Sequence, residues 1–311
     1  MKKLWQYLLN HLKSDFKPRA YLYIATFLAL SIVLNYYFDF EDNVIDRQQG
    51  ILKFSLFFIT HAGAYFIPVL ILKAFKTDSI KLNSQFWIRS VLALALLSAD
   101  RSLLLVETYI FKLLDARVFL WGFKVINNLA GLLYIMLPLY IFYKLKDIQS
   151  KNFYGLSQGS SAVLKPYLII LATMLPVIVA ASFLPGFQKQ YPMYITTTAP
   201  SYLGIPEWLT VAGYELAYAL NFVTIEFFYR GFLVLGMLAC LGRSAILPMA
   251  CLYCSLHFGK PMPEAISSIF GGYILGVFAY ETKSIWGGVV VHVGIAWMME
   301  IAAFMQSLYH R

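Results

Sequence analysis

The sequence predicts an all-α protein, a polytopic bundle of transmembrane helices that crosses the bilayer about eight or nine times. Of the 311 residues, 60% are hydrophobic and only 13% are charged, about half the charge of an ordinary soluble domain. Apolar runs near the roughly 20 residues that span a bilayer core as a helix recur along the chain. An aromatic content of 17% and a total of three cysteines exclude a disordered chain and a disulfide scaffold.

Nine segments are candidate membrane spans. The basic segment Met1–Arg19 precedes them and is typical of a helix that lies at the membrane interface. The third candidate is short and contains Arg89, so the number of spans depends on it. In chain order the candidates are Ala20–Phe38, Phe54–Leu72, Phe86–Ala99, Trp121–Tyr143, Tyr167–Leu184, Glu207–Leu241, Ala245–Phe258, Glu264–Tyr280 and Ser284–Met305.

The positive charge follows the membrane topology. A net charge of +9 can indicate a nucleic-acid partner, but Lys and Arg form short clusters between apolar runs and no continuous stripe. With the N-terminus inside, the inside segments hold fifteen of the 25 Lys and Arg residues and the outside segments hold nine. We therefore expect the lipid bilayer as partner, no nucleic acid, and an N-terminus inside. If Phe86–Ala99 does not span, every later loop changes sides.

The best internal boundary is the polar connection Lys144–Lys165, which contains Gly155, Gly159 and several serines. It predicts an N-terminal membrane region over residues 1–150, with about four spans and no motif, and a core over residues 151–311. The core contains nearly all the residues whose chemistry needs an explanation.

Charged side chains occur where lipid is expected. A charge at the bilayer centre costs about 2.5 to 3.5 kcal/mol on insertion scales, so it needs a partner or a task. Glu226 and Arg230 stand at i and i+4 on one helix and are predicted to form an ion pair. A purely structural pair is one interpretation, but desolvation offsets most of its attraction, which favours a functional use.

Histidines from two further spans complete the candidate site. His257 ends an apolar run, and His292 is flanked by Gly287, Gly288 and Gly294, small residues that allow helices to approach closely. Together with Glu226, the two histidines could position a nucleophilic water or bind a divalent metal such as zinc, the candidate ligands being Glu226, His257 and His292.

These residues resemble the motifs of the CAAX prenyl protease and bacteriocin-processing (CPBP) family of intramembrane endopeptidases. That family has a pair of glutamates with an Arg four residues later, an aromatic residue four before a His, and a His four before an Asn. The matching segments here are Ile225–Arg230, Tyr253–His257 and His292–Ala296. The resemblance covers roughly residues 155–305 and implies Glu226, Arg230, His257 and His292 as site residues. For such a protein we expect the plasma membrane of a bacterium.

Two positions depart from the family pattern. Ile225 stands where the family has the glutamate that is given the water-activating role, and Ala296 stands where it has the Asn thought to stabilise the oxyanion. Glu300 is a possible substitute on the last span, and a polar group near a span terminus is the alternative interpretation.

The resemblance implies an intramembrane endopeptidase that hydrolyses peptide bonds of membrane-bound or lipidated peptides with water activated by Glu226 and His257. Metal-assisted and metal-free chemistry are both compatible with it. The alternative, motivated by Ile225 and Ala296, is a catalytically inactive relative that binds peptides or partner proteins. A transporter with a proton relay is a third hypothesis, which the absence of an inverted repeat in the sequence disfavours.

Overall fold

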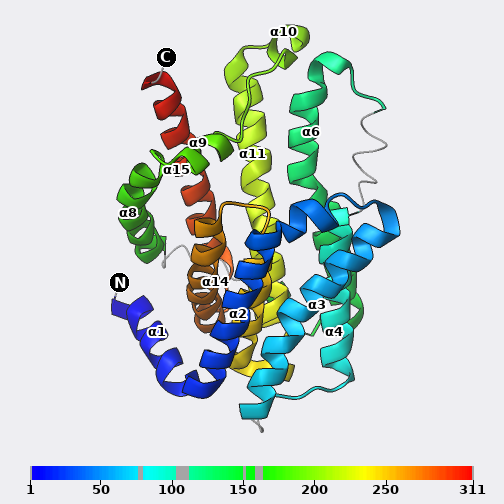
Figure 1. Cartoon of the computed structure of the whole chain (residues 1–311), viewed down its shortest axis with the longest axis vertical. Helices are drawn as coiled ribbons and strands as arrows, with labels where there is room; N and C mark the ends of the chain where they lie inside the picture. Colours follow the sequence, from blue (N-terminus) through cyan, green and yellow to red (C-terminus); the bar gives the residue numbers. More distant parts are fainter. Residues whose placement is uncertain (1, 76–79, 103–111, 150–151, 158–163, 310–311) are drawn as a thin grey trace. The chain divides into compact units, whose positions relative to one another are not determined.

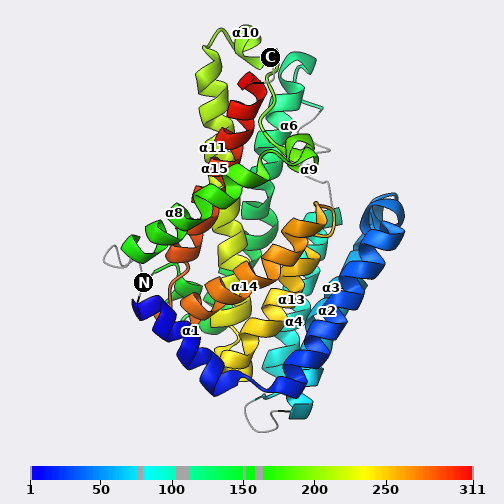
Figure 2. The same ribbon diagram turned by 60° about the vertical axis from the view of Figure 1, so that its left-hand side comes forward.

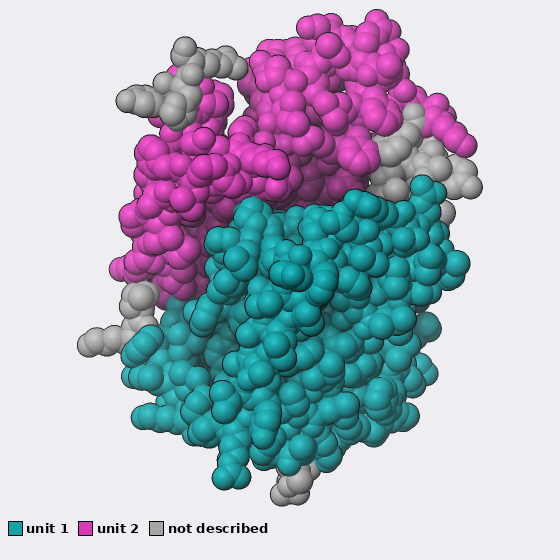
Figure 3. Space-filling view, in the orientation of Figure 1, with its two compact units in different colours: residues 1–103, 139–159, 226–286 teal, residues 104–138, 160–225, 287–311 magenta. Residues whose placement is uncertain are grey.

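The described chain is helical throughout. The computed structural model describes residues 2–75, 80–102, 112–149, 152–157 and 164–309, and every regular element within those ranges is a helix (Figure 1). The predicted all-α fold class is confirmed. The chain divides into two compact units, which Figure 3 colours teal and magenta. Unit 1 takes residues 1–103, 139–159 and 226–286, and unit 2 takes residues 104–138, 160–225 and 287–311.

Both units draw on residues before and after the predicted boundary at residue 150. Part of the polar connection Lys144–Lys165 lies outside the described residues. The assignment of residues 1–150 and 151–311 to two functional regions stays a prediction.

Unit 1 is built on α13, a short helix that is enclosed by its neighbours. All ten residues of α13 (Ile246–Ser255) are buried, as expected for a helix that is apolar all round. It packs against α3 and α14, and α2 packs along α3 (Figure 2). The other elements of this unit are α1 (Lys2–Asp15), α2 (Pro18–Phe38), η1 (Glu41–Ile45), α3 (Gly50–Phe75), α4 (Ser84–Ser102), η3 (Tyr143–Asp147), η4 (Phe153–Gly155), η6 (Phe227–Leu235), α12 (Leu238–Leu241), η7 (Gly242–Ala245) and α14 (Met262–Thr282).

Unit 2 contains long helices that continue from those of unit 1 along the chain. The chain passes between the units within α7 (Leu137–Phe142), at the last residue of α11 (Glu207–Glu226) and at the first residue of α15 (Trp286–Tyr309). Its remaining elements are α6 (Ala116–Gly131), η2 (Leu132–Met136), α8 (Leu164–Ala181), α9 (Pro185–Gln190) and α10 (Ala199–Leu203).

Six helical runs among the described residues are long and apolar enough to cross a membrane. They are Pro18–Phe38, Gly50–Phe75, Ala116–Asp147, Glu207–Ser255, Met262–Thr282 and Trp286–Leu308, with Lys165–Ala181 as a shorter apolar helix. The predicted Glu207–Leu241 and most of Ala245–Phe258 share a single run of 49 residues, so the count of eight or nine is approximate. Large apolar side chains such as Leu22, Leu30 and Val33 of α2 are exposed, as lipid-facing residues of an integral membrane protein are.

The third predicted span is a helix of unit 1 but is absent from these six runs. Phe86–Ala99 lies within α4, whose buried residues Phe86, Ser90, Ala93, Leu94 and Leu97 follow the i, i+3 and i+4 spacing of one helix face. That face packs against α3. Trp87, Ile88 and Val91 are exposed on the other side of the helix. The low overall hydrophobicity of α4 comes from its buried serines, Ser90, Ser98 and Ser102, and from its charged residues Arg89, Asp100 and Arg101.

Candidate functional site

The motif glutamate and arginine lie where the helix changes from α to π. α11 ends at Glu226, and η6 continues as a π-helix over Phe227–Leu235, in which the N–H of Gly236 donates to the carbonyl of Gly231 at 2.9 Å. The predicted span Glu207–Leu241 thus lies within one helical run, which changes from α-helix to π-helix after Glu226. Longer π-helices are rare and frequently mark functional sites.

The π-helix allows a very close approach of another segment. A Cβ atom on Gly231 would lie 2.7 Å from the carbonyl oxygen of Tyr154, which no side chain tolerates without a shift. Tyr154 belongs to η4, where Phe153 and Tyr154 both have positive φ angles, a conformation that is uncommon for aromatic residues. Gly231 is therefore required by the packing of η4 directly beside the site.

Glu226 and Arg230 form the predicted ion pair. Nη1 of Arg230 lies 2.9 Å from Oε1 of Glu226, and neither side chain is exposed to solvent. The pair therefore holds a carboxylate inside unit 1 with a fixed orientation.

Tyr253 connects this pair to His257. The guanidinium carbon of Arg230 lies 4.4 Å from the centre of the Tyr253 ring, a cation–π contact. The ring of Tyr253 in turn meets the ring of His257 edge to face at 4.7 Å. The motif residues of unit 1 thus form one continuous series of contacts: Glu226, Arg230, Tyr253, His257.

His257 lies in a turn, two residues after the end of α13 at Ser255, so the span predicted to reach Phe258 is three residues shorter as a helix. Its Nδ1 atom is 2.9 Å from the carbonyl oxygen of Tyr253. A carbonyl can only accept, so Nδ1 donates in this contact. A metal would bind the imidazole through its other ring nitrogen, Nε2.

An apolar cavity adjoins this turn. It has a volume of about 380 Å³ and is lined by residues of α2, η1, α3 and α13, the last including Ser255, and by Phe258, which directly follows His257 in the turn. The other lining residues are mostly aliphatic or aromatic, and the polar ones include Asn35, Glu41 and Thr60. The cavity offers a hydrocarbon environment with a few hydrogen-bonding groups.

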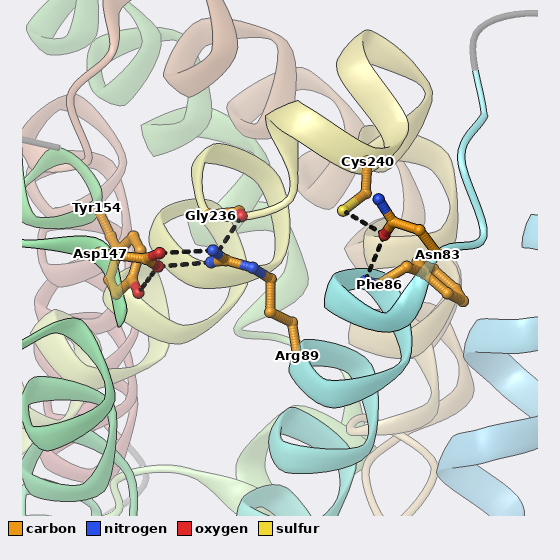
Figure 4. A network of polar contacts seen from close by, with 7 residues as sticks. All are labelled: Asn83, Phe86, Arg89, Asp147, Tyr154, Gly236 and Cys240. Atoms are coloured by element: carbon orange, nitrogen blue, oxygen red, sulfur yellow. Dashed lines mark hydrogen bonds and ion pairs between the residues drawn. The ribbon is translucent and has the colours of Figure 1, made fainter. Parts of the chain in front are cut away.

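A second polar network holds the far end of the π-helix (Figure 4). Arg89 of α4 donates to both carboxylate oxygens of Asp147, at 2.5 and 2.6 Å, and to the carbonyl of Gly236 at 3.2 Å. Tyr154 donates its hydroxyl to the same carboxylate. The charge that made Phe86–Ala99 a weak span is thus paired within the protein, with about 12% of the Arg89 side chain exposed.

The third motif lies in unit 2, on α15. The half-buried ring of His292 stacks on Phe222 of α11, with centroids 5.5 Å apart and an interplanar angle of 19°. Ala296 is buried in a cluster with Tyr214 and Tyr218. The position of the family Asn is therefore part of an aromatic cluster in this chain.

Glu300 has a local role in unit 2. Its two carboxylate oxygens accept hydrogen bonds from the backbone N–H groups of Met193, at 2.8 Å, and Tyr194, at 3.2 Å. Lys124 donates to the carbonyl of Met193 at 2.7 Å. Glu300 thus ties the loop before α10 to α15, which agrees with the interpretation of a structural polar group better than with a substitute for Ile225.

Carboxylate and imidazole groups, which Glu226, His257 and His292 carry, are common ligands of divalent metals. The distances among these three side chains are not defined, because the residues belong to different units. Glu226 and His257 belong to unit 1 and His292 to unit 2. Within the described ranges, no group of three or more His, Cys, Asp or Glu residues is placed to hold a metal ion. Nε2 is the nitrogen through which His257 would bind a metal, and Oε1 of Glu226 is engaged by Arg230. The zinc set Glu226, His257 and His292 stays a prediction.

Comparison with known protein families identifies the same region of the chain. Residues 207–298 match the family model described as type II CAAX prenyl endopeptidase Rce1-like, which is consistent with the CPBP resemblance. This segment includes Glu226, Arg230, His257 and His292. Comparisons with curated proteins and with solved structures found no match.

Proposed function

Because residues 207–298 carry an Rce1-like region, a family that points to CAAX-type intramembrane proteases, we propose that the protein is an intramembrane endopeptidase. It hydrolyses peptide bonds of membrane-bound or lipidated peptides. The observation that carries the proposal is the series of contacts from Glu226 through Arg230 and Tyr253 to His257. A carboxylate and an imidazole held together inside a membrane protein are the groups that peptide hydrolysis needs.

In this proposal Glu226 and His257 together activate the water that attacks the peptide carbonyl. Arg230 keeps Glu226 oriented, which its 2.9 Å contact supports. His292 stabilises the oxyanion or protonates the leaving amine. A divalent metal held by Glu226, His257 and His292 would supply a more acidic water.

The cavity beside His257 supports the proposed class of substrate. Its volume of about 380 Å³ and its largely apolar lining suit a hydrocarbon chain. A lipid chain enters the cavity from a bilayer that is equally apolar, so close packing against the lining residues, and not transfer out of water, would select an attached lipid anchor. The peptide itself would then lie close to the turn that carries His257.

The test is peptide cleavage by the full chain in nanodiscs, with prenylated and unmodified peptides as substrates. Glu226→Gln and His257→Ala are expected to abolish cleavage, because each removes a group that activates water. Glu215→Ala, which changes a glutamate eleven residues earlier on α11, is the matched control and should retain activity. Cleavage that persists in both site variants would overturn the proposal. Loss of activity with a chelator, restored by zinc, would establish the metal.

A second function is favoured by specific observations. Ile225 replaces the glutamate that the resemblance implies as the water-activating group, and Glu226 is fully buried in its ion pair. Both suit a catalytically inactive relative that binds membrane peptides or partner proteins. The double variant Ile225→Glu/Ala296→Asn distinguishes the two functions. Activity that appears only in this variant supports the binding protein, whereas an active wild type excludes it.

We also propose that the protein lies in the plasma membrane of a bacterium with its N-terminus inside. The Lys and Arg residues before Phe86 support this orientation whether or not Phe86–Ala99 spans. Eight of them lie in segments assigned to the inside, and Arg47 and Lys53 lie in the first outside segment. Single cysteines placed in alternate loops of a variant lacking Cys240, Cys251 and Cys254, labelled with a membrane-impermeant maleimide, test it. Labelling of an N-terminal cysteine in intact cells would contradict the orientation.

A further inference from the structure

The turn that carries His257 is held by side chains from the first predicted span. Oη of Tyr36 donates to the carbonyl of His257 at 3.2 Å and to that of Lys260 at 2.7 Å. Nδ2 of Asn35 donates to the carbonyl of Phe258 at 3.1 Å. Two adjacent residues of α2 therefore bind three of the four carbonyls between residues 257 and 260.

These carbonyls need donors because the helix has already ended. α13 ends at Ser255, so the carbonyls of residues 257–260 lie beyond the helix and have no intrahelical donors. A buried carbonyl without a partner costs about 1 to 3 kcal/mol, and the apolar cavity beside the turn offers few alternatives. Within the turn, the N–H of Lys260 donates to the carbonyl of His257 at 3.1 Å. Asn35, which is buried, and Tyr36 supply donors for the carbonyls of Phe258 and Lys260 and a further one for His257.

The same part of α2 is fixed in turn by η1. Oδ1 of Asn35 accepts from the N–H of Glu41 at 3.2 Å, and Glu41 pairs with Arg101 of α4. A Cβ atom on Gly259 would lie 3.1 Å from Oε1 of Glu41, so the turn packs tightly on η1. The amide of Asn35 is thereby oriented, with its oxygen toward Glu41 and its nitrogen toward Phe258.

We propose that Asn35 and Tyr36 are positioning residues for His257. They hold the backbone of the turn so that the imidazole keeps its Nδ1 contact with Tyr253 and thereby its orientation in the site. The proposal rests on the proposed function, and it gives the motif-free first half of the chain a role in the site. Neither side chain takes part in the chemical step.

The test compares Tyr36→Phe and Asn35→Ala/Tyr36→Phe with the wild type in nanodiscs. Tyr36→Phe keeps the ring and removes both hydrogen bonds to the turn. Displacement of a catalytic group by about 1 Å costs on the order of 100-fold in rate, so we expect kcat to fall about 10-fold in the single variant and about 100-fold in the double variant. KM should stay within about twofold in Tyr36→Phe, because Tyr36 does not line the substrate cavity, whereas Asn35 does.

Tyr21→Phe is the matched control on the same helix. Its hydroxyl also makes two contacts, 3.1 Å to Asp15 and 3.0 Å to Tyr273, but none to the His257 turn. It should leave kcat unchanged. If Tyr21→Phe lowers kcat as much as Tyr36→Phe, or if Tyr36→Phe changes KM alone, the positioning role is wrong.

A readout that does not depend on activity separates this inference from the proposed function. Hydrogen exchange of the peptide covering residues 256–261, and the rate at which diethyl pyrocarbonate modifies His257, should both rise several-fold in the double variant and not in Tyr21→Phe. Unchanged exchange and modification in the double variant would overturn the inference. If the wild type cleaves nothing, the proposed function fails, and these two rates still decide whether Asn35 and Tyr36 position His257.

Discussion

Arg230 and Glu226 face each other at 2.9 Å at the junction between α11 and the π-helix, with both side chains fully buried. The ring of Tyr253 covers the guanidinium group. Two opposite charges are thus removed from solvent together, so each one depends on the other for its stability. This dependence distinguishes the pair from the exposed ion pairs of the chain, such as that of Arg117 with Asp115.

Loss of one partner should therefore cost more than loss of both. Arg230→Leu removes the cation from a fully buried carboxylate and should lower the free energy of unfolding by about 3 to 5 kcal/mol. Glu226→Gln/Arg230→Leu leaves no buried charge and should recover part of that loss. The free energies of unfolding of the single and double variants are measured in mixed detergent micelles. A double variant whose loss equals the sum of the single losses would contradict the coupling.

Gly231→Ala should destabilise unit 1. The added Cβ atom would lie 2.7 Å from the carbonyl oxygen of Tyr154, and rigid backbone stands on both sides of the contact. Overpacking of this kind costs about 1 to 3 kcal/mol. Gly271→Ala in α14 is the control, because a Cβ atom there meets nothing within 4 Å. A helical Gly→Ala change without a clash stabilises by about 0.5 to 1 kcal/mol, so thermal unfolding should show opposite signs for the two variants.

Arg89→Lys should weaken the connection between α4 and the end of η6. A lysine cannot reproduce the paired hydrogen bonds to Asp147 and also reach the carbonyl of Gly236. We expect a loss of about 1 to 3 kcal/mol in the free energy of unfolding. Arg117→Lys removes a similar two-bond contact with Asp115, but there 60% of the arginine side chain is exposed, so the loss should stay below about 1 kcal/mol. Equal losses would show that burial does not set the strength of these pairs.

The sequence predicted the features that local spacing determines. Long apolar runs predicted helices such as α2 and α3, and the i, i+4 spacing predicted the contact of Glu226 with Arg230. The π-helix after Glu226 was not predicted, because its hydrogen-bond pattern occurs where a distant segment, Tyr154 in η4, packs against Gly231. The number of spans was uncertain for a related reason, since Arg89 is tolerated through a partner 58 residues away.

The residues that hold the His257 turn in place could be predicted even less well than the helices. Asn35 and Tyr36 contact the His257 turn across more than 220 residues of sequence, and they bind backbone carbonyls, which every residue type possesses. A hydrogen bond to a backbone carbonyl requires no particular residue type at the accepting position, so the sequence of the His257 turn gives no sign of it. The one available signal was the pair of polar residues near the end of an otherwise apolar first span. Glu300 shows the same limit, because it binds backbone N–H groups of Met193 and Tyr194.

Glu300→Ala should release the loop before α10. Removal of the carboxylate leaves the N–H groups of Met193 and Tyr194 without their acceptor in unit 2, so their hydrogen exchange should become at least 10-fold faster. Glu300→Gln keeps one acceptor oxygen and should show a smaller increase. Peptide cleavage, if the wild type performs it, should fall by less than about 10-fold in Glu300→Gln. Complete loss of cleavage would instead indicate that Glu300 acts as the catalytic base.

Glu41 should make the stability of unit 1 depend on pH near neutrality. Burial raises the pKa of its carboxyl from 4.5 to about 7, an effect that the nearby Asp42 and Asp46 increase and Arg101 opposes. The native state therefore binds this proton more tightly than the unfolded state does. The resulting stability, about 3 kcal/mol, is present below pH 4.5 and is lost as the pH rises through 7. Glu41→Gln cannot titrate, so the stability of the wild type relative to Glu41→Gln should fall between pH 5 and 8, as measured by thermal unfolding in nanodiscs. Parallel curves for the two proteins would show that Glu41 titrates at its ordinary pKa in the folded protein.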